Sequence, residues 1–126
     1  MVHTHIAETK TEQADMENQR KMKTVEYLDR IGFLGSNVLG AHCVWLSNNE
    51  IKLLARAGTK VAHCPVSNMK LAVCAAAPIA ELAESGVSVG LGTDGAASNN
   101  TLDMFETIKF CALLHKHSIG PDRRAG

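Results

Sequence analysis

Four short apolar runs recur along the 126-residue chain, and a segment of helical character follows each of them. The runs cover residues 2–6, 37–46, 59–64 and 87–94. Apolar, partly β-branched strands that alternate with helices are typical of a parallel sheet whose faces are covered. The alternation therefore predicts an α/β fold with four parallel strands, and the length allows one domain over residues 1–126.

Helix signals fill the segments between the runs. The predicted helices are two within residues 8–30, one over 47–58, one over 78–86 and one over 99–116. Ser47 or Asn48 can cap the 47–58 helix, and Gly58 can end it. The residues after Pro65 are expected to form a loop, as is the unpatterned tail over 117–126. In the last predicted helix, the apolar residues at helical spacing are Leu102, Phe105, Ile108 and Ala112.

Composition argues against several classes of partner. Lysine plus arginine and aspartate plus glutamate number 13 each, so no net charge attracts nucleic acid or an anionic membrane. No apolar run is long enough to span a membrane, and no signal peptide is expected. The cysteines, whose spacing indicates reduced thiols in a cytoplasmic protein, are Cys43, Cys64, Cys74 and Cys111. Of these, Cys74 and Cys111 are expected to pack as small apolar residues.

A polar residue closes each apolar run. These residues are His5, His42, His63 and Asp94, and Glu8 follows His5 by three positions. Consecutive right-handed βαβ units bring the carboxyl ends of their strands to one edge of the sheet, so these side chains should gather there. Imidazole and carboxylate ligands suit a divalent transition metal, and bound zinc lowers the pKa of its water to about 7. The remaining carboxylate and histidine would carry protons or orient the reacting groups.

Other interpretations apply to single histidines. His63 is more readily explained as a hydrogen-bonded structural residue than as a ligand, and His3, on the same strand face as His5, as a neighbour of the ligands. A structural zinc held by the two His-Cys pairs, at 42–43 and 63–64, is the less favoured reading, because adjacent strand residues point to opposite faces. No chemistry is assigned to two histidines that suit a helix end, His115 and His117.

Asp94 is the residue for which a purely structural role is hardest to argue. It follows two glycines and a threonine at the end of an apolar strand, where an aspartate is costly unless a cation meets it. Capping of the next helix is the rival role. The residues better placed for that role are Ser98, Asn99 and Asn100.

Four segments resemble consecutive signature blocks of the amidohydrolase superfamily. They read HTHIAET, GAHCVWLS, AHCPVSNMKLA and VGLGTDGAASNNTLDMFETIK. The nearest subgroup is that of the 5-methylthioadenosine/S-adenosylhomocysteine deaminases and related chlorohydrolases. Its fold is a (β/α)8 barrel with one catalytic zinc or iron. The resemblance implies a partial TIM-type barrel, in which the four strands here correspond to the fifth to eighth.

The resemblance also implies a role for each residue that matches a family position. His5 matches a metal ligand, and Asp94 matches an aspartate that binds the metal and takes a proton from water. Glu8 matches the carboxylate that protonates the substrate ring, and His42 the histidine that orients the attacking hydroxide. In the implied reaction hydroxide adds to an amidine carbon of a purine ring and ammonia leaves. The matching substrate-pocket positions are Glu8, Asn68 and Ser98.

Parts of the family pattern have no counterpart here. The first-strand HxH pair, the first four βα units and the small β-domain are absent, and the HTH at residues 3–5 belongs to the fifth-strand block. The segment AVCAAAPI lacks the glycine-containing turn that is usual near Cys74. We therefore expect the C-terminal half of a barrel, whose open edges favour self-association or pairing with the missing half.

The function predicted from these observations is that of a fragment of a zinc- or iron-dependent hydrolase that deaminates a purine-type small molecule. One alternative is a triazine- or guanine-type deaminase or chlorohydrolase. A second is a non-catalytic half-barrel that acts only through association. A third is the structural-zinc protein built on the two His-Cys pairs.

Overall fold

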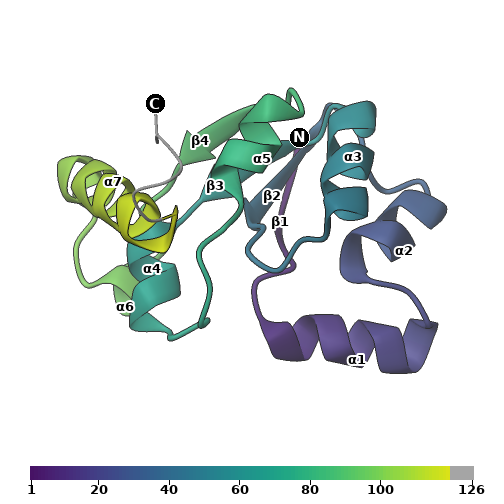
Figure 1. The fold of residues 1–126 in the computed structure, drawn as a ribbon, viewed down its shortest axis with the longest axis horizontal. Helices are drawn as coiled ribbons and strands as arrows, with labels where there is room; N and C mark the ends of the chain where they lie inside the picture. The colour runs from purple at the N-terminus through teal and green to yellow at the C-terminus, as the bar shows by residue number, and fades with distance from the viewer. Residues whose placement is uncertain (120–126) are drawn as a thin grey trace.

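A computed structural model describes residues 1–119. Four parallel strands form one sheet in the order β1-β2-β3-β4 (Figure 1). They are β1 Val2–Ile6, β2 Val38–His42, β3 Lys60–His63 and β4 Val89–Leu91. The helices are α1 Lys10–Arg20, α2 Thr24–Arg30, α3 Asn48–Ala57, α4 Pro65–Lys70, α5 Ile79–Glu84, α6 Ala96–Asn99 and α7 Met104–Ile119. The predicted α/β fold with a parallel sheet is confirmed.

One face of the sheet packs against helices and the other is open. The strand residues Ile6 and Val61 are buried with Val25 of α2, Leu54 of α3 and Leu82 of α5. Because strand side chains alternate between faces, the neighbours of these core residues point the other way. On that open side the exposed histidines of β1 line a cavity with residues of β2 and β3.

Helix α3 begins and ends as its sequence predicts. The Ser47 side chain accepts a hydrogen bond from the Glu50 N–H, and Gly58 ends the helix with φ 70°. Glu50 is fully buried, and its carboxylate accepts hydrogen bonds from the Ser47 N–H, the Val25 N–H and the Gln13 side chain. This one carboxylate therefore joins α1, α2 and α3 beside β2.

Helix α4 corrects the prediction of a loop after Pro65. Proline is tolerated in the first helical turn, where its missing N–H has no partner to lose, and Pro65 begins the helix. The expected caps of α7 are also wrong, because Ser98 and Asn99 lie inside α6. Asp103 takes that role, since its Oδ1 accepts hydrogen bonds from the N–H groups of Phe105 and Glu106.

Helix α7 buries a different face from the one its apolar residues mark. The apolar residues predicted at helical spacing are all exposed: Leu102, which precedes the helix, and Phe105, Ile108 and Ala112 on it. The buried residues are instead Thr107, Cys111 and His115, spaced by four, and α7 packs against β4 and α4 (Figure 1). The helix includes His117 and ends at Ile119, so the rest of the predicted tail loop, 120–126, lies outside the described residues.

No described helix combines the length and the apolar character that a membrane span requires.

Candidate active site

The carboxyl ends of β1, β2 and β4 carry left-handed backbone at residues other than glycine. Ala7 follows β1 with φ 51°, His42 ends β2 with φ 70°, Cys43 follows with φ 49°, and Asp94 has φ 61°. Such conformations are costly for residues with a β-carbon and cluster at functional sites. The N–H groups of Cys43 and Val44 bond to the carbonyls of Ile6 and Ala7, which ties the first two strand ends together.

Three of the predicted site residues meet at these strand ends. The rings of His5 and His42 stack with their centroids 5.2 Å apart and their planes 11° apart. Glu8 Oε2 lies 3.8 Å from His42 Nε2. One potential ligand atom from each of the three residues lies within 4.8 Å of the other two. The parallel pairing causes this, because it places His5 opposite Ala41 and Ile6 opposite His42.

A side chain of α4 holds the His42 ring in one orientation. The ring is 1% exposed, and its Nδ1–H donates a hydrogen bond of 2.8 Å to Asn68 Oδ1. In the neutral ring Nε2 then carries the lone pair, which faces the Glu8 carboxylate across 3.8 Å. Two facing acceptors at this distance favour a proton or a cation between them. The donor set of imidazole and carboxylate thus fits a divalent transition metal.

Asp94 is anchored by α4 and by its own turn. Ser67 Oγ donates to Asp94 Oδ2 at 2.6 Å, and the Gly95 N–H donates to Oδ1 at 2.8 Å. Burial opposes ionisation of Asp94, but the hydrogen bonds led by those from Ser67 and Gly95 outweigh it and hold the pKa of the carboxyl below its ordinary value. The group is therefore an ionised carboxylate at neutral pH, as a metal ligand must be.

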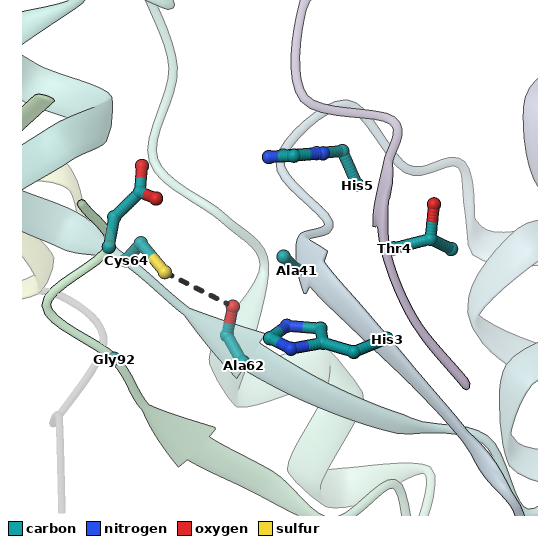
Figure 2. A pocket seen from close by; sticks show the side chains of 8 residues that line it. His3, Thr4, His5, Ala41, Ala62, Cys64 and Gly92 are labelled. Atoms are coloured by element: carbon teal, nitrogen blue, oxygen red, sulfur yellow. Dashed lines mark hydrogen bonds between the residues drawn. The ribbon is translucent and has the colours of Figure 1, made fainter. Parts of the chain in front are cut away.

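A cavity of about 310 Å³ connects His5 with Asp94 on the open face of the sheet. Its lining residues are His3, Thr4, His5, Ala41, Ala62, Cys64, Gly92 and Asp94. Figure 2 shows the His3 and His5 rings directed from β1 toward the side where Cys64 lies. His3 thus lies beside His5 in the cavity but outside the group formed with Glu8 and His42.

Sequence reasoning named Asn68 as a substrate-pocket position but missed Ser67 and the role of α4 in holding His42 and Asp94. Ser67 and Asn68 are adjacent, are 0% and 2% exposed, and contact Asp94 and His42 respectively. Asn68 Nδ2 is buried and has no hydrogen-bond partner among the described residues. Ser98 donates a hydrogen bond to the Gly95 carbonyl at 3.1 Å. The available signal was Pro65, a residue that often begins a helix. A helix predicted from Pro65 would have placed residues 67 and 68 in one turn.

His63 does not take part in this group. It is fully buried, and its Nε2 lies 3.0 Å from Nε2 of His115, to which no chemistry was assigned. Cys111 is buried as predicted, whereas the expectation that Cys74 packs inside is wrong, because Cys74 is exposed. Neither Cys43 nor Cys64 belongs to a group of potential metal ligands within residues 1–119, which argues against the structural zinc on the His-Cys pairs.

The whole chain, residues 1–126, matches the model of the Amidohydrolase family. The chain belongs to the amidohydrolase family. It is 52% identical over 119 residues to the 5'-deoxyadenosine deaminase of Methanothrix thermoacetophila, covering 94% of this chain and 29% of that protein. It is 50% identical over 115 residues to 5-methylthioadenosine/S-adenosylhomocysteine deaminase 1 of Archaeoglobus fulgidus, covering 91% of this chain and 27% of that protein.

Solved amidohydrolase structures share the arrangement. A zinc-bound adenosine deaminase from Xanthomonas campestris superposes with a TM-score of 0.87 at 40% identity, covering 92% of this chain and 26% of that one. The zinc complex of the atrazine chlorohydrolase from Arthrobacter aurescens TC1 gives 0.87 at 29% identity, covering 95% and 26%. The chain thus spans between a quarter and a third of the length of the relatives it matches.

Proposed function

We propose that residues 1–126 form one domain, the part of a (β/α)8 barrel that carries four site residues of a metal-dependent deaminase of purine nucleosides. The observation that carries the proposal is the meeting of His5, Glu8 and His42 at the ends of β1 and β2. The substrate class is that of adenosine derivatives altered at the 5' position. Identities near 50% to proteins named as 5'-deoxyadenosine and 5-methylthioadenosine/S-adenosylhomocysteine deaminases support this class.

One divalent ion, zinc or iron, is the cofactor in this proposal, with His5 and Asp94 as its ligands from these residues. When bound, such an ion lowers the pKa of water to about 7 and so supplies hydroxide at neutral pH. His42, whose ring is oriented by the bond from Nδ1–H to Asn68, presents Nε2 to the attacking water and orients it. The Asp94 carboxylate, held by Ser67, receives a proton and passes it to the leaving amine.

Glu8 carries the second proton transfer. It is partly buried, and its Oε2 lies 3.8 Å from His42 Nε2. A carboxylic acid in this place donates a proton to a ring nitrogen of the purine, which makes the ring carbon that hydroxide attacks more electrophilic. The amine then leaves as ammonia. Asn68 Nδ2, which is buried and has no hydrogen-bond partner within residues 1–119, and the Ser98 hydroxyl are further groups for the substrate.

Three surfaces of these residues lack a packing partner within residues 1–119: the outer edges of β1 and β4 and the apolar face of α7. In the described sheet β1 and β4 each have one neighbouring strand, so each has an open edge. The apolar residue Leu102, just before α7, and the α7 residues Phe105 and Ile108 are 64%, 86% and 51% exposed. We assign all three surfaces to contact with the other βα units of the barrel, either from the rest of a longer chain or from an associating copy.

Chlorohydrolysis of a triazine is the second candidate, because the superposition on an atrazine chlorohydrolase is as close as that on the adenosine deaminase. The 29% identity to that chlorohydrolase, against about 50% to the deaminases, places it second.

The test is product release by the complete, zinc- or iron-loaded barrel that contains these residues. We expect ammonia from 5'-deoxyadenosine and 5-methylthioadenosine, and no chloride from a chlorotriazine. Glu8→Gln should abolish ammonia release, whereas the matched change Glu17→Gln, at an exposed position of α1, should leave it unchanged. Chloride release without ammonia, or full activity of Glu8→Gln, would overturn the proposal.

A further inference from the structure

A second group of potential metal ligands lies away from the candidate active site. It consists of His63 at the end of β3 and of Cys111 and His115 on α7. One potential ligand atom from each residue lies within 4.8 Å of the other two, and the facing Nε2 atoms of the histidines are 3.0 Å apart. His63 is 0%, Cys111 9% and His115 7% exposed, so the group is nearly closed to solvent.

The two groups occupy opposite faces of the sheet. Ala62 and Cys64, on either side of His63, line the cavity that holds His5 and Asp94. Side chains alternate along a strand, so His63 points to the other face, where α7 packs. The two α7 residues are four apart, and residues at this spacing lie on the same side of a helix. The packing of α7 on β3 therefore brings these three side chains together, independently of the candidate active site.

The distances suit a tetrahedral ion. With Zn–N bonds of about 2.0 Å and tetrahedral angles, two nitrogen ligands lie about 3.3 Å apart. The observed 3.0 Å between the Nε2 atoms needs only a small opening. The ring planes stand 65° apart, so both in-plane lone pairs can point to one ion without the rings colliding. Two imidazoles and a thiolate are borderline-soft ligands, which Zn²⁺ and Co²⁺ accept.

The protonation states of the two histidines favour a cation, whereas burial raises the pKa of Cys111, so that metal binding must displace the thiol proton. Burial lowers the pKa of His63 to about 4, so its ring is neutral at pH 7, as a metal ligand must be. Burial also lowers the pKa of His115, although the charge of Glu81 on α5 acts in the opposite direction. The Glu81 carboxylate thus adds negative charge beside the group, and together with a Cys111 thiolate it would balance a divalent ion.

A hydrogen bond between the two histidines is the competing explanation. It fills the space between the Nε2 atoms with a single proton and leaves the Cys111 thiol without a role. Nδ1 of His63 is buried without a partner among the described residues, and both explanations leave it so, because both use Nε2. The two explanations differ in one measurable property, which is the presence of a thiolate ligand.

We propose that His63, Cys111 and His115 form a second metal site, for Zn²⁺ or a similar divalent ion, that fastens α7 to β3. On binding, the Cys111 thiol loses its proton to solvent, a metal–sulfur bond forms, and each histidine gives an Nε2 lone pair. A water molecule completes the coordination. The site is structural and does not depend on the proposed deaminase activity.

The test is a titration of the metal-free protein with Co²⁺, followed by absorption spectroscopy. A thiolate ligand gives an intense near-ultraviolet charge-transfer band that histidines and carboxylates do not give. We expect this band in the wild-type protein, its loss in Cys111→Ser, and its retention in Cys74→Ser, the control at the exposed cysteine. It should also persist in Cys64→Ser, which removes the thiol of the candidate active-site cavity.

Three outcomes would overturn the proposal: no thiolate band in the wild-type protein, a band that survives Cys111→Ser, or a band that is lost in Cys64→Ser. If Cys111→Ser fails to fold, His115→Gln decides, because it keeps every thiol. It should weaken the affinity for Co²⁺ measured at the thiolate band by about tenfold or more. An unchanged affinity would rule the site out. No substrate is used, so the result is independent of the proposed activity.

Discussion

Asn68 fixes the orientation of His42. The His42 Nδ1–H donates a 2.8 Å hydrogen bond to Asn68 Oδ1, and both side chains are almost entirely buried. The bond selects one imidazole tautomer, in which the lone pair of Nε2 faces the Glu8 carboxylate. Asn68, in the first turn of α4, thus determines which ring nitrogen of His42 faces Glu8.

Replacing Asn68 should disturb this tautomer. Asn68→Ala removes the acceptor, so His42 should populate both neutral tautomers, and the rate of deamination should fall by about 10- to 100-fold. Asn68→Asp keeps an acceptor and should retain the wild-type tautomer. The measurement is the pair of ¹⁵N chemical shifts of the His42 ring, read alongside kcat. Asn49→Ala, which removes an exposed hydrogen bond to Glu26, is the control. A single tautomer in Asn68→Ala would show that another contact orients the ring.

Ser67→Ala should weaken metal binding at the candidate active site. The change removes the 2.6 Å hydrogen bond that holds Asp94 Oδ2 in place. Outer partners of ligating carboxylates are worth about 10- to 100-fold in affinity, so a tenfold or larger loss is expected. Competition for zinc with a chromogenic chelator measures it. Ser118→Ala, which removes an exposed hydroxyl bonded to the Leu114 carbonyl on α7, should leave the affinity unchanged. Equal losses in both variants would point to a general effect on the fold.

Glu50 should be among the most sensitive positions for stability. It is fully buried, and Glu50→Ala removes the acceptor of the buried Val25 N–H and of the partly buried Ser47 N–H, while Gln13 Nε2 keeps the Trp45 carbonyl. Unsatisfied buried donors cost about 1–3 kcal/mol each, so we expect the free energy of unfolding to fall by at least about 2 kcal/mol. Urea denaturation measures the change. Glu17→Ala, on the exposed side of α1, should change it by less than about 0.5 kcal/mol. A similar small change for Glu50→Ala would show that water replaces the carboxylate.

The order of the strands and helices, and the edge of the sheet at which the site residues gather, could be predicted from the sequence because both follow from local patterns. Apolar runs alternate with capped helices, and the parallel connection brings the carboxyl ends of the strands together. His5, Glu8 and His42 meet for this reason.

The supporting contacts could not be predicted in this way, because they join residues far apart in the chain. Neither the bond from Ser67 to Asp94 nor the pairing of His63 with His115 has a local signature. The apolar spacing of α7 was misleading for a related reason. Its apolar face is exposed in the described residues, while the buried face is made by Thr107, Cys111 and His115. Thr107 Oγ1 donates to the Asp103 carbonyl, and His115 contacts His63 of β3.

The cysteines should differ strongly in reactivity toward iodoacetamide in the metal-free protein. The thiolate is the reactive form. Burial raises the pKa of Cys43 to about 12 and that of Cys64 to about 11, and it also raises the pKa of Cys111. At pH 8 the thiolate fraction of Cys64 is therefore only about one in a thousand. Cys74 is the exposed thiol and should be labelled first.

The pH dependence follows from the same raised pKa values. As pH rises from 8 toward 11, the thiolate fraction of Cys64 grows about tenfold per unit, so its labelling rate should rise in parallel while burial remains a constant factor. Mass spectrometry of labelled peptides over this range measures each rate. In Cys74→Ser the fast phase should disappear and the slow phases remain. Labelling of Cys64 at pH 8 as fast as that of Cys74 would mean that the cavity side of β3 opens to solvent far more often than the packing around Cys64 implies.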